Sequence, residues 1–306
     1  MNNKPTTSPL FKFTIILTIV LHIAVFIYIT IFLNVNPLLG IPIVLLSELI
    51  LCSLIVSIEE RKSFIEEFRD FFLLFGDFIY IPLATYLLYV LSSIIKVPPI
   101  VLVPITVWIL VPLMPFLIEI TVKTEDISDE NSIRLLHELK KKMNISKNIK
   151  LKLFASDLLV TAIFAGTIFA SIYVNKKLSS ILNQEEIKAV LAHELAHYKE
   201  KHLHKSTMFH TILCIALFGI MYLVKTLKLP YEIILPVILA FFVLSFLYAR
   251  HNEIEADIIA ARVTNPGALI SALQKIKGKT MPLPLLYPHP PLKKRIEIIR
   301  KAVNSQ

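Results

Sequence analysis

Cysteine is scarce in this chain of 306 residues, which has only Cys52 and Cys214. Both fall inside long apolar runs, so we expect apolar packing of the two thiols and no disulfide framework. Acidic side chains are also few, with 23 Asp and Glu against 32 Lys and Arg. The first apolar run is not followed by a small-x-small cleavage site, which argues against a signal peptide and predicts a retained membrane span.

Long hydrophobic runs dominate the composition. Hydrophobic residues make up 55% of the chain, and its mean hydropathy is +0.68. A transmembrane helix needs about 20 mostly apolar residues. Six runs approach or exceed this length, and we predict a span at each: 13–33, 41–58, 71–95, 97–120, 207–224 and 231–249. The second run contains Glu48, and an intramembrane carboxylate is a functional candidate by default, although a protonated or serine-paired interior residue is an equal alternative.

The distribution of basic residues predicts the orientation in the membrane. If the N-terminus is cytoplasmic, 29 of the 32 Lys and Arg lie in cytoplasmic segments and three lie outside, Lys96, Lys225 and Lys228. This bias follows the positive-inside rule. The net charge of +9 therefore reflects topology and attraction to anionic lipid headgroups rather than nucleic-acid binding. We predict a multi-pass protein of the cell membrane with both termini and residues 121–206 in the cytoplasm.

One apolar run, 158–174, is expected to form strands instead of a seventh span. It is short, rich in β-branched and aromatic residues, and interrupted by Gly166. It predicts two strands around a turn near Gly166, after another strand near 149–155. A helix is predicted over 129–143, and the pattern N-x-x-E at Asn183 indicates the start of a second helix that continues to about residue 201.

That second helix carries the segment HELAH at 193–197. His193 and His197 are four residues apart, so their imidazoles project from one helix face and can bind a single zinc ion. Glu194 follows the first histidine and can act as general base on the water at the metal. Zinc would lower the pKa of that water and polarise a scissile carbonyl. The pattern predicts a zinc hydrolase.

A catalytic zinc site needs a third protein ligand. The three-histidine pattern H-E-x-x-H-x-x-G-x-x-H is excluded, because Glu200 and Leu203 stand where it requires Gly and His. His202 and His204 do not fit that spacing, and we expect them at the solvated basic end of the helix. A glutamate further along the chain is then the alternative.

The segment RHNEIEAD at 250–257 follows the sixth predicted span. A helix turns about 100° per residue, so Glu253 and Asp257 share one face and Glu255 lies about 200° away from Glu253. We therefore predict Glu253 as the third ligand and Asp257 as a carboxylate that orients a ligand histidine. Glu255 is expected to be a surface charge. His251 is a competing ligand, disfavoured by its flanking position.

Three motifs in this order resemble the membrane gluzincins, a family that includes HtpX and the type 1 CAAX prenyl endoproteases. They are HELAH at 193–197, R-x-x-E-x-x-x-D at 250–257 after two predicted spans, and HPPLKKRIEII at 289–299. The resemblance covers residues 125–306. It implies one zinc ion per chain, bound by His193, His197 and Glu253.

The resemblance also implies roles for other residues. Glu194 would be the base, Asp257 would support the site, and His289 would approach it from the C-terminal segment as a donor to the oxyanion. The family often has Asn-Ala-Phe-Ala on a sheet edge where substrate pairs as an added strand. The corresponding residues here are Ala162, Ile163, Phe164 and Ala165, without the Asn. Main-chain pairing can survive this change.

The expected fold is an α-helical integral membrane protein of about six transmembrane helices with a zincin-like α+β catalytic domain at the cytoplasmic face. Four parts are predicted: a four-span region at 1–120, a helix–sheet region with HELAH at 121–206, a two-span hairpin at 207–249, and a C-terminal catalytic segment at 250–306. HtpX-like proteins usually have two spans before the catalytic part. The extra pair leaves substrate choice and oligomeric state open.

The function that these features favour is a zinc-dependent endopeptidase acting on membrane or membrane-proximal polypeptides, as in HtpX-like quality control. A CAAX prenyl endoprotease is the alternative within the same chemistry, although six spans are few for a large intramembrane chamber. A membrane sensor or scaffold that keeps the metal site without proteolysis is the alternative of a different class. The intact Glu194 disfavours it, because a structural zinc site does not need this residue.

Overall fold

The computed structural model describes residues 99–156, 161–230, 233–276 and 289–304, together with the isolated positions 50, 54, 57, 63–65 and 96. Apart from those positions, Glu48 and the predicted spans at 13–33, 41–58 and 71–95 lie outside the described residues. The chain forms two compact units. One comprises Met1–Thr106 with Asp157–Leu159, and the other comprises Val107–Ser156 with Val160–Gln306.

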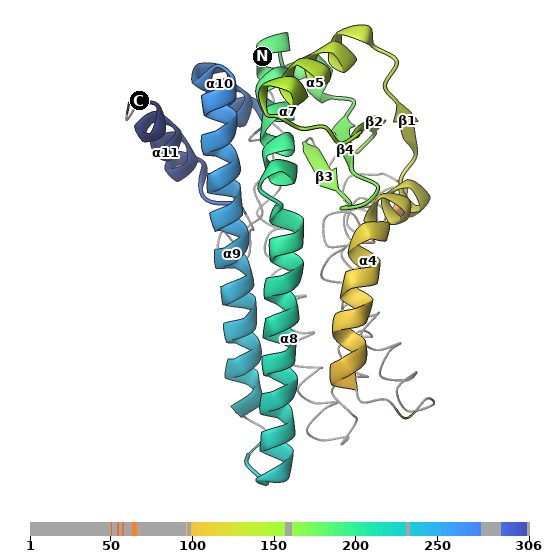
Figure 1. Cartoon of the computed structure of the whole chain (residues 1–306), viewed down its shortest axis with the longest axis vertical. Helices are drawn as coiled ribbons and strands as arrows, with labels where there is room; N and C mark the ends of the chain where they lie inside the picture. The colour runs from red at the N-terminus through yellow and green to blue at the C-terminus, as the bar shows by residue number, and fades with distance from the viewer. Residues whose placement is uncertain are drawn as a thin grey trace. The chain divides into compact units, whose positions relative to one another are not determined.

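A four-stranded sheet lies in the second unit (Figure 1). Its strands occur in the order β1-β2-β4-β3, with bounds Thr124–Asp126 for β1, Lys150–Phe154 for β2, Ala162–Ala165 for β3 and Ser171–Asn175 for β4. β2 and β4 are parallel, and the two outer pairs are antiparallel. The strand predicted near 149–155 and the two predicted around Gly166 are confirmed. β1 was not predicted, because three polar residues give no alternating pattern.

The turn between β3 and β4 explains the glycine that interrupts the apolar run. Gly166 has φ +82°, and a Cβ atom there would lie 2.5 Å from Cγ of Pro115 and 2.7 Å from the carbonyl oxygen of Phe169. Pro115 belongs to α4 (Pro99–Thr121), so the turn packs directly on that helix. Only glycine accepts both the positive φ and the close approach.

Two polar contacts also connect α4 to the sheet. The Tyr173 hydroxyl of β4 lies 3.2 Å from the Pro115 carbonyl oxygen and 3.1 Å from Glu119 Oε1. On β2, Lys152 places Nζ 2.8 Å from the same glutamate oxygen. The end of α4 is therefore held to the central strands by a hydrogen-bonded ion pair as well as by packing.

Helices cover the sheet and enclose the main core. The helix predicted over 129–143 is confirmed as α5 (Glu130–Lys142), and it buries Leu135, Leu136 and Leu139. The helix predicted from Asn183 is α7 (Gln184–Lys199), preceded by the short α6 (Leu178–Ile181). Of the described helices that come later in the chain, three also contribute to the core: α9 (Ile234–Val263), α10 (Pro266–Ile276) and α11 (Leu292–Asn304). The core is built from α5, β2, β4, α7, α9, α10 and α11.

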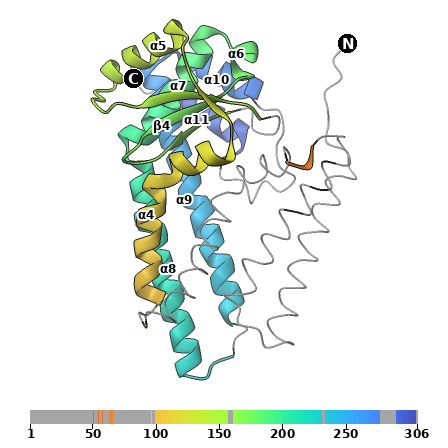
Figure 2. The same cartoon turned by 90° about the vertical axis from the view of Figure 1, so that its right-hand side faces the viewer.

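Two long helices leave this core in the same direction (Figures 1 and 2). They are α8 (His202–Thr226) and α9, and they pack against each other as a hairpin. Within the part of the chain that the structure describes, one segment, His202–Val224, is long and apolar enough to cross a membrane. It contains the predicted span 207–224. From residue 99 onward the predicted span 97–120 falls in α4, and from residue 234 onward the predicted span 231–249 falls in the first part of α9. The total number of spans stays a prediction.

The start of α7 is fixed by a capping box. The Asn183 side chain accepts a hydrogen bond from the Glu186 amide at 2.9 Å, and the Glu186 carboxylate accepts one from the Asn183 amide at 2.8 Å. Glu186 is buried and also accepts from Ser271 Oγ at 2.6 Å and Lys275 Nζ at 2.7 Å on α10. One carboxylate thus caps the helix that carries HELAH and ties it to α10.

Glu186 gives a pH-dependent prediction. Burial raises the pKa of Glu186, but the hydrogen bonds from Lys275, Ser271 and the Asn183 backbone outweigh it and lower the pKa to about 2. Its contribution is therefore present above the unfolded pKa of about 4.3 and is lost as the pH falls toward 2. Glu186→Gln should lower the free energy of unfolding by about 1–3 kcal/mol at pH 7 and reduce its decline below pH 4. Denaturant unfolding as a function of pH measures both effects.

The matched control is Glu185→Gln, which changes an exposed carboxylate in the same first turn. Its unfolding curve should stay within about 0.5 kcal/mol of the wild type. Equal effects of the two substitutions would contradict the assignment.

Candidate metal centre

The metal-binding side chains meet where α7 packs against α9. His193 and His197 come from α7, and Glu253 comes from α9. The two histidine Nε2 atoms lie 3.2 Å apart. Glu253 Oε2 lies 3.5 Å from Nε2 of His193, and its Oε1 lies 3.4 Å from Nε2 of His197. Within the described residues these three side chains form the group able to hold a metal ion.

The spacing of these atoms fits zinc. With zinc–ligand bonds of about 2.0–2.1 Å, neighbouring ligand atoms of a tetrahedral site lie about 3.3 Å apart. The two histidine Nε2 atoms are 3.2 Å apart, and each lies 3.4–3.5 Å from a different carboxylate oxygen of Glu253, so the observed separations are close to that value. Two imidazoles and one carboxylate are also the donor set of many catalytic zinc sites, which leave one position open for water or substrate.

A buried ion pair stands behind the first histidine. Asp257 is buried, and its carboxylate accepts from Arg295 of α11 in a fork, with Nε–Oδ2 at 2.6 Å and Nη2–Oδ1 at 2.7 Å. Asp257 Oδ1 also lies 3.0 Å from His193 Nδ1. That ring nitrogen is buried and makes no geometrically defined hydrogen bond, so the contact is mainly electrostatic. The role of Asp257 as the carboxylate that orients a ligand histidine stays a prediction.

The charges of the group reinforce one another. Burial raises the pKa of Glu253, but the neighbouring histidines, with His289 first among them, outweigh it and hold the pKa well below its usual range. For Asp257, burial likewise raises the pKa while Arg295 and His193 lower it by more. Burial lowers the pKa of His193, yet the two carboxylates raise it above its ordinary value. Both carboxylates are therefore ionised and suited to a cation.

The C-terminal segment, residues 289–304, contacts the predicted ligand Glu253 through two side chains. His289 Nδ1 lies 2.5 Å from Glu253 Oε2, and Arg295 Nη2 lies 3.7 Å from the same oxygen. The segment thus contacts the predicted ligand as well as Asp257. The role of Arg295 was not predicted, although it occupies a fixed place in the motif HPPLKKRIEII.

Glu194 is the other residue of the HELAH motif with a predicted role. It is buried on α7 and lies between the two ligand histidines in the sequence.

The predicted substrate strand is β3, which pairs with β4 on one side and forms the end of the sheet. The Phe164 ring contacts the ring of Tyr198, next to His197, at a centroid distance of 5.9 Å. The structure therefore places an edge strand beside the helix that carries the ligands.

Two expectations on α8 and α9 were wrong. His202 was expected at a solvated helix end, but it is only 3% exposed. Its Nδ1 lies 3.0 Å from Nδ1 of His197, and its Nε2 lies 3.0 Å from Glu255 Oε2. Glu255 is therefore more than a surface charge. His204 and His251 are both exposed, as expected for His204, and His251 lies outside the metal-binding group.

The described part of the chain is a zincin-like α+β domain with a candidate His-His-Glu metal group. The sequence model of peptidase family M48 matches residues 100–303. The chain therefore belongs to peptidase family M48, and its His-His-Glu group is a candidate zinc site. This confirms the family resemblance seen in the three motifs.

The fold is also similar to a solved structure. The crystal structure of S. mikatae Ste24p aligns with a TM-score of 0.57 and 17% sequence identity. The alignment covers 76% of this chain and 64% of that chain, so the present chain spans somewhat less than two thirds of its length. No curated protein matches the sequence.

The ion pair between Asp257 and Arg295 gives a second prediction. Arg295→Ala leaves a buried carboxylate without its fork, which should lower the free energy of unfolding by about 3–5 kcal/mol. Zinc affinity should fall by about 10- to 100-fold, because the carboxylate no longer holds His193 in place. Denaturant unfolding and competition with a chelator measure the two effects.

Arg300→Ala removes an exposed arginine of the same helix and is the control. Similar unfolding curves and zinc affinities for the two variants would show that the fork does not support the site.

Proposed function

We propose that the chain is a zinc-dependent endopeptidase that cleaves membrane or membrane-proximal polypeptides at the cytoplasmic face of the cell membrane. The observation that carries this proposal is the position of the metal-binding group. His193 and His197 lie on α7, directly before the apolar segment His202–Val224, and Glu253 lies on the helix that pairs with it. Such a site would meet substrates close to the bilayer surface.

Zinc, when bound, supplies a Lewis acid that polarises the scissile carbonyl and makes water a stronger nucleophile. In the proposed mechanism Glu194 takes the proton from the attacking water and later donates it to the leaving amine. His193, His197 and Glu253 are the ligands. His289 donates a hydrogen bond to the oxyanion of the tetrahedral intermediate. Its contact with Glu253 supports this role, since it brings the imidazole to the ligand group.

Substrate binding is proposed to use the edge of the sheet. Residues Ala162–Ala165 form β3, whose second edge faces away from β4. An extended polypeptide can add to such an edge through main-chain hydrogen bonds, which require no particular side chain. The contact between Phe164 and Tyr198 supports the proposal, because it holds this edge close to the helix of the ligands.

Two finer questions belong to this proposal. HtpX-like quality control requires cleavage of unmodified polypeptides, whereas a CAAX prenyl endoprotease requires a prenylated substrate. Cleavage of matched peptides with and without a prenyl group distinguishes them, and we expect the unmodified peptide to be cleaved.

Glu194→Gln tests the enzymatic proposal. Glutamine keeps the shape of the side chain but cannot accept a proton, and Glu194 is not among the metal-binding side chains. We expect zinc content to remain near one ion per chain and cleavage of casein to fall by about 10²- to 10⁴-fold. Zinc content and peptidase rate are measured on detergent-purified full-length protein, with and without chelator.

The control is Glu200→Gln, which changes the glutamate at the C-cap of the same helix, outside the metal-binding group. It should keep its zinc and its rate. Undiminished, chelator-sensitive cleavage by zinc-loaded Glu194→Gln would contradict the proposed base. Zinc binding without any cleavage by the wild type would favour a sensor or scaffold.

A further inference from the structure

We propose that His202 and Glu255 act as positioning residues for the zinc ligand His197, through a hydrogen-bonded chain that ends on the Glu255 carboxylate. The inference rests on the zinc site proposed above and extends it to the ring nitrogen of His197 that faces away from the metal-binding group. It gives each ligand histidine a carboxylate from α9, one in direct contact and the other through an intervening imidazole.

The chain of contacts runs away from the metal-binding group. His197 directs Nε2 toward the other ligands, at 3.2 Å from His193 Nε2 and 3.4 Å from Glu253 Oε1. Its other ring nitrogen, Nδ1, lies 3.0 Å from Nδ1 of His202. His202 Nε2 in turn lies 3.0 Å from Glu255 Oε2. All these separations fall within hydrogen-bond distance or ligand spacing.

The three side chains allow one consistent arrangement of hydrogens for neutral imidazoles. A metal ligand at Nε2 leaves the hydrogen of His197 on Nδ1, which must be the donor. His202 Nδ1 must then be the acceptor, so its hydrogen is on Nε2 and is donated to Glu255. Each donor faces an acceptor, and the terminal acceptor is charged. Such a chain fixes the ring plane of a ligand histidine and raises its basicity.

The backbone turn between α7 and α8 makes this contact possible. His202 follows His197 by five residues, a spacing that does not place two side chains together on a continuous helix. Lys201 adopts φ +56° between the two helices, and its amide donates to the Tyr198 carbonyl at 3.0 Å. A left-handed conformation at a residue other than glycine costs about 1 kcal/mol. The bend returns His202 to the end of α7.

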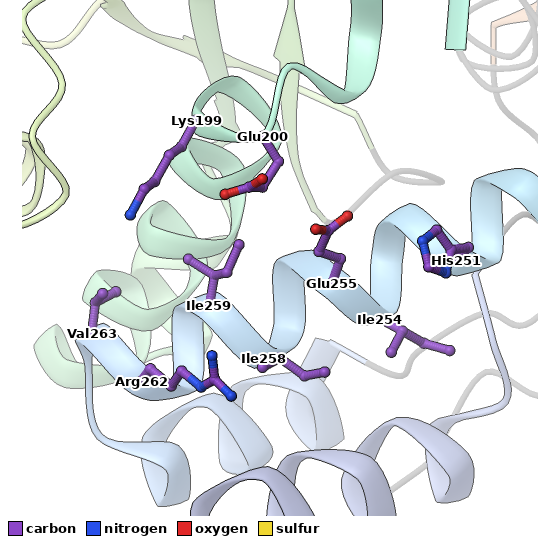
Figure 3. Close-up of a pocket in the computed structure, with 9 residues that line it drawn as sticks. All are labelled: Lys199, Glu200, His251, Ile254, Glu255, Ile258, Ile259, Arg262 and Val263. Carbon is purple, nitrogen blue, oxygen red and sulfur yellow. The ribbon is translucent and has the colours of Figure 1, made fainter. Parts of the chain in front are cut away.

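Figure 3 shows how α9 supplies the carboxylate. Glu255 extends from α9 toward the C-terminal end of α7, where Glu200 lies, and both line an open pocket of about 490 Å³. The Glu255 side chain is 36% exposed, whereas that of Asp257 is 1% exposed. Solvent therefore screens the relay through Glu255 more than the contact of Asp257 with His193. His202, buried at the centre of the relay, is the residue to substitute.

Two isosteric substitutions separate the hydrogen bonds of His202. Asparagine places Oδ1 at the position of His202 Nδ1, so His202→Asn keeps the acceptor for His197. Glutamine places its amide nitrogen near the position of Nε2, so His202→Gln keeps the contact with Glu255 and loses the acceptor. If the relay orients His197, His202→Gln should weaken zinc binding by about 10- to 100-fold. His202→Asn keeps the acceptor for His197 and loses only the contact with the partly exposed Glu255, so its loss should be smaller, about three-fold.

The measurement is the zinc dissociation constant of the purified full-length protein by competition with a chromophoric chelator. The visible spectrum of the cobalt(II)-substituted protein gives a second readout, since it reports ligand geometry without any substrate. We expect a changed spectrum for His202→Gln and an unchanged one for His202→Asn. Thermal unfolding of the metal-free variants shows whether each is folded, and His204→Gln, which changes an exposed histidine nearby, is the control.

Equal loss of affinity in both His202 variants, or no loss in either, would overturn the proposal and leave His202 as a packing residue. A greater loss in His202→Asn than in His202→Gln would overturn it as well. A wild-type protein that binds zinc but cleaves nothing refutes the proposed peptidase function and leaves this comparison intact. A wild-type protein that binds no zinc overturns both.

Discussion

The close packing of α7 against α9 is the contact on which the metal-binding group depends. Five alanines of these two helices are completely buried in the core that the helices share: Ala189, Ala192, Ala196, Ala256 and Ala260. Side chains at the contact set the distance between two packed helices. Small side chains on both helices therefore allow a glutamate of α9 to reach two histidines of α7. Larger residues here would separate the ligands even if each helix stayed folded.

Charge balance is the second constraint, because the contact between these helices buries two carboxylates. Asp257 is compensated by the fork of Arg295, and Glu253 by the histidines around it. Isolated buried charges are costly unless they are paired and hydrogen-bonded. The C-terminal segment supplies both Arg295 and His289. The segment therefore supplies the positive and hydrogen-bonding partners of the two carboxylates, whereas the predicted metal ligands all lie earlier in the chain.

Helical periodicity was sufficient to predict the centre of the site. His193 and His197 share a face by spacing, and the same argument placed Glu253 and Asp257 together on α9. The two strands around Gly166 followed from composition and from the single glycine, whose positive φ and contact with Pro115 explain why the run is interrupted. In each case the relevant information lies within a few consecutive residues.

The features that were missed depend on contacts between distant segments or on an unusual backbone conformation. His202 meets His197 because Lys201 bends the chain with a positive φ, and a lysine gives no sequence signal for that conformation. Glu255 was interpreted as a surface charge because periodicity placed it away from Glu253, without showing that α8 lies on that side. β1 has three residues, and its strand conformation depends on antiparallel pairing with β2, which is distant in the sequence.

The central claim is that two imidazoles and one carboxylate from α7 and α9 bind a single zinc ion. Zinc-edge X-ray absorption on the full-length protein tests it directly, compared with the Glu253→Ala variant. The account predicts two imidazole nitrogens and one carboxylate oxygen at about 2.0–2.2 Å in the wild type, and loss of most bound zinc in the variant. Sulfur or a third imidazole in the wild-type spectrum, or an unchanged spectrum in Glu253→Ala, would contradict it.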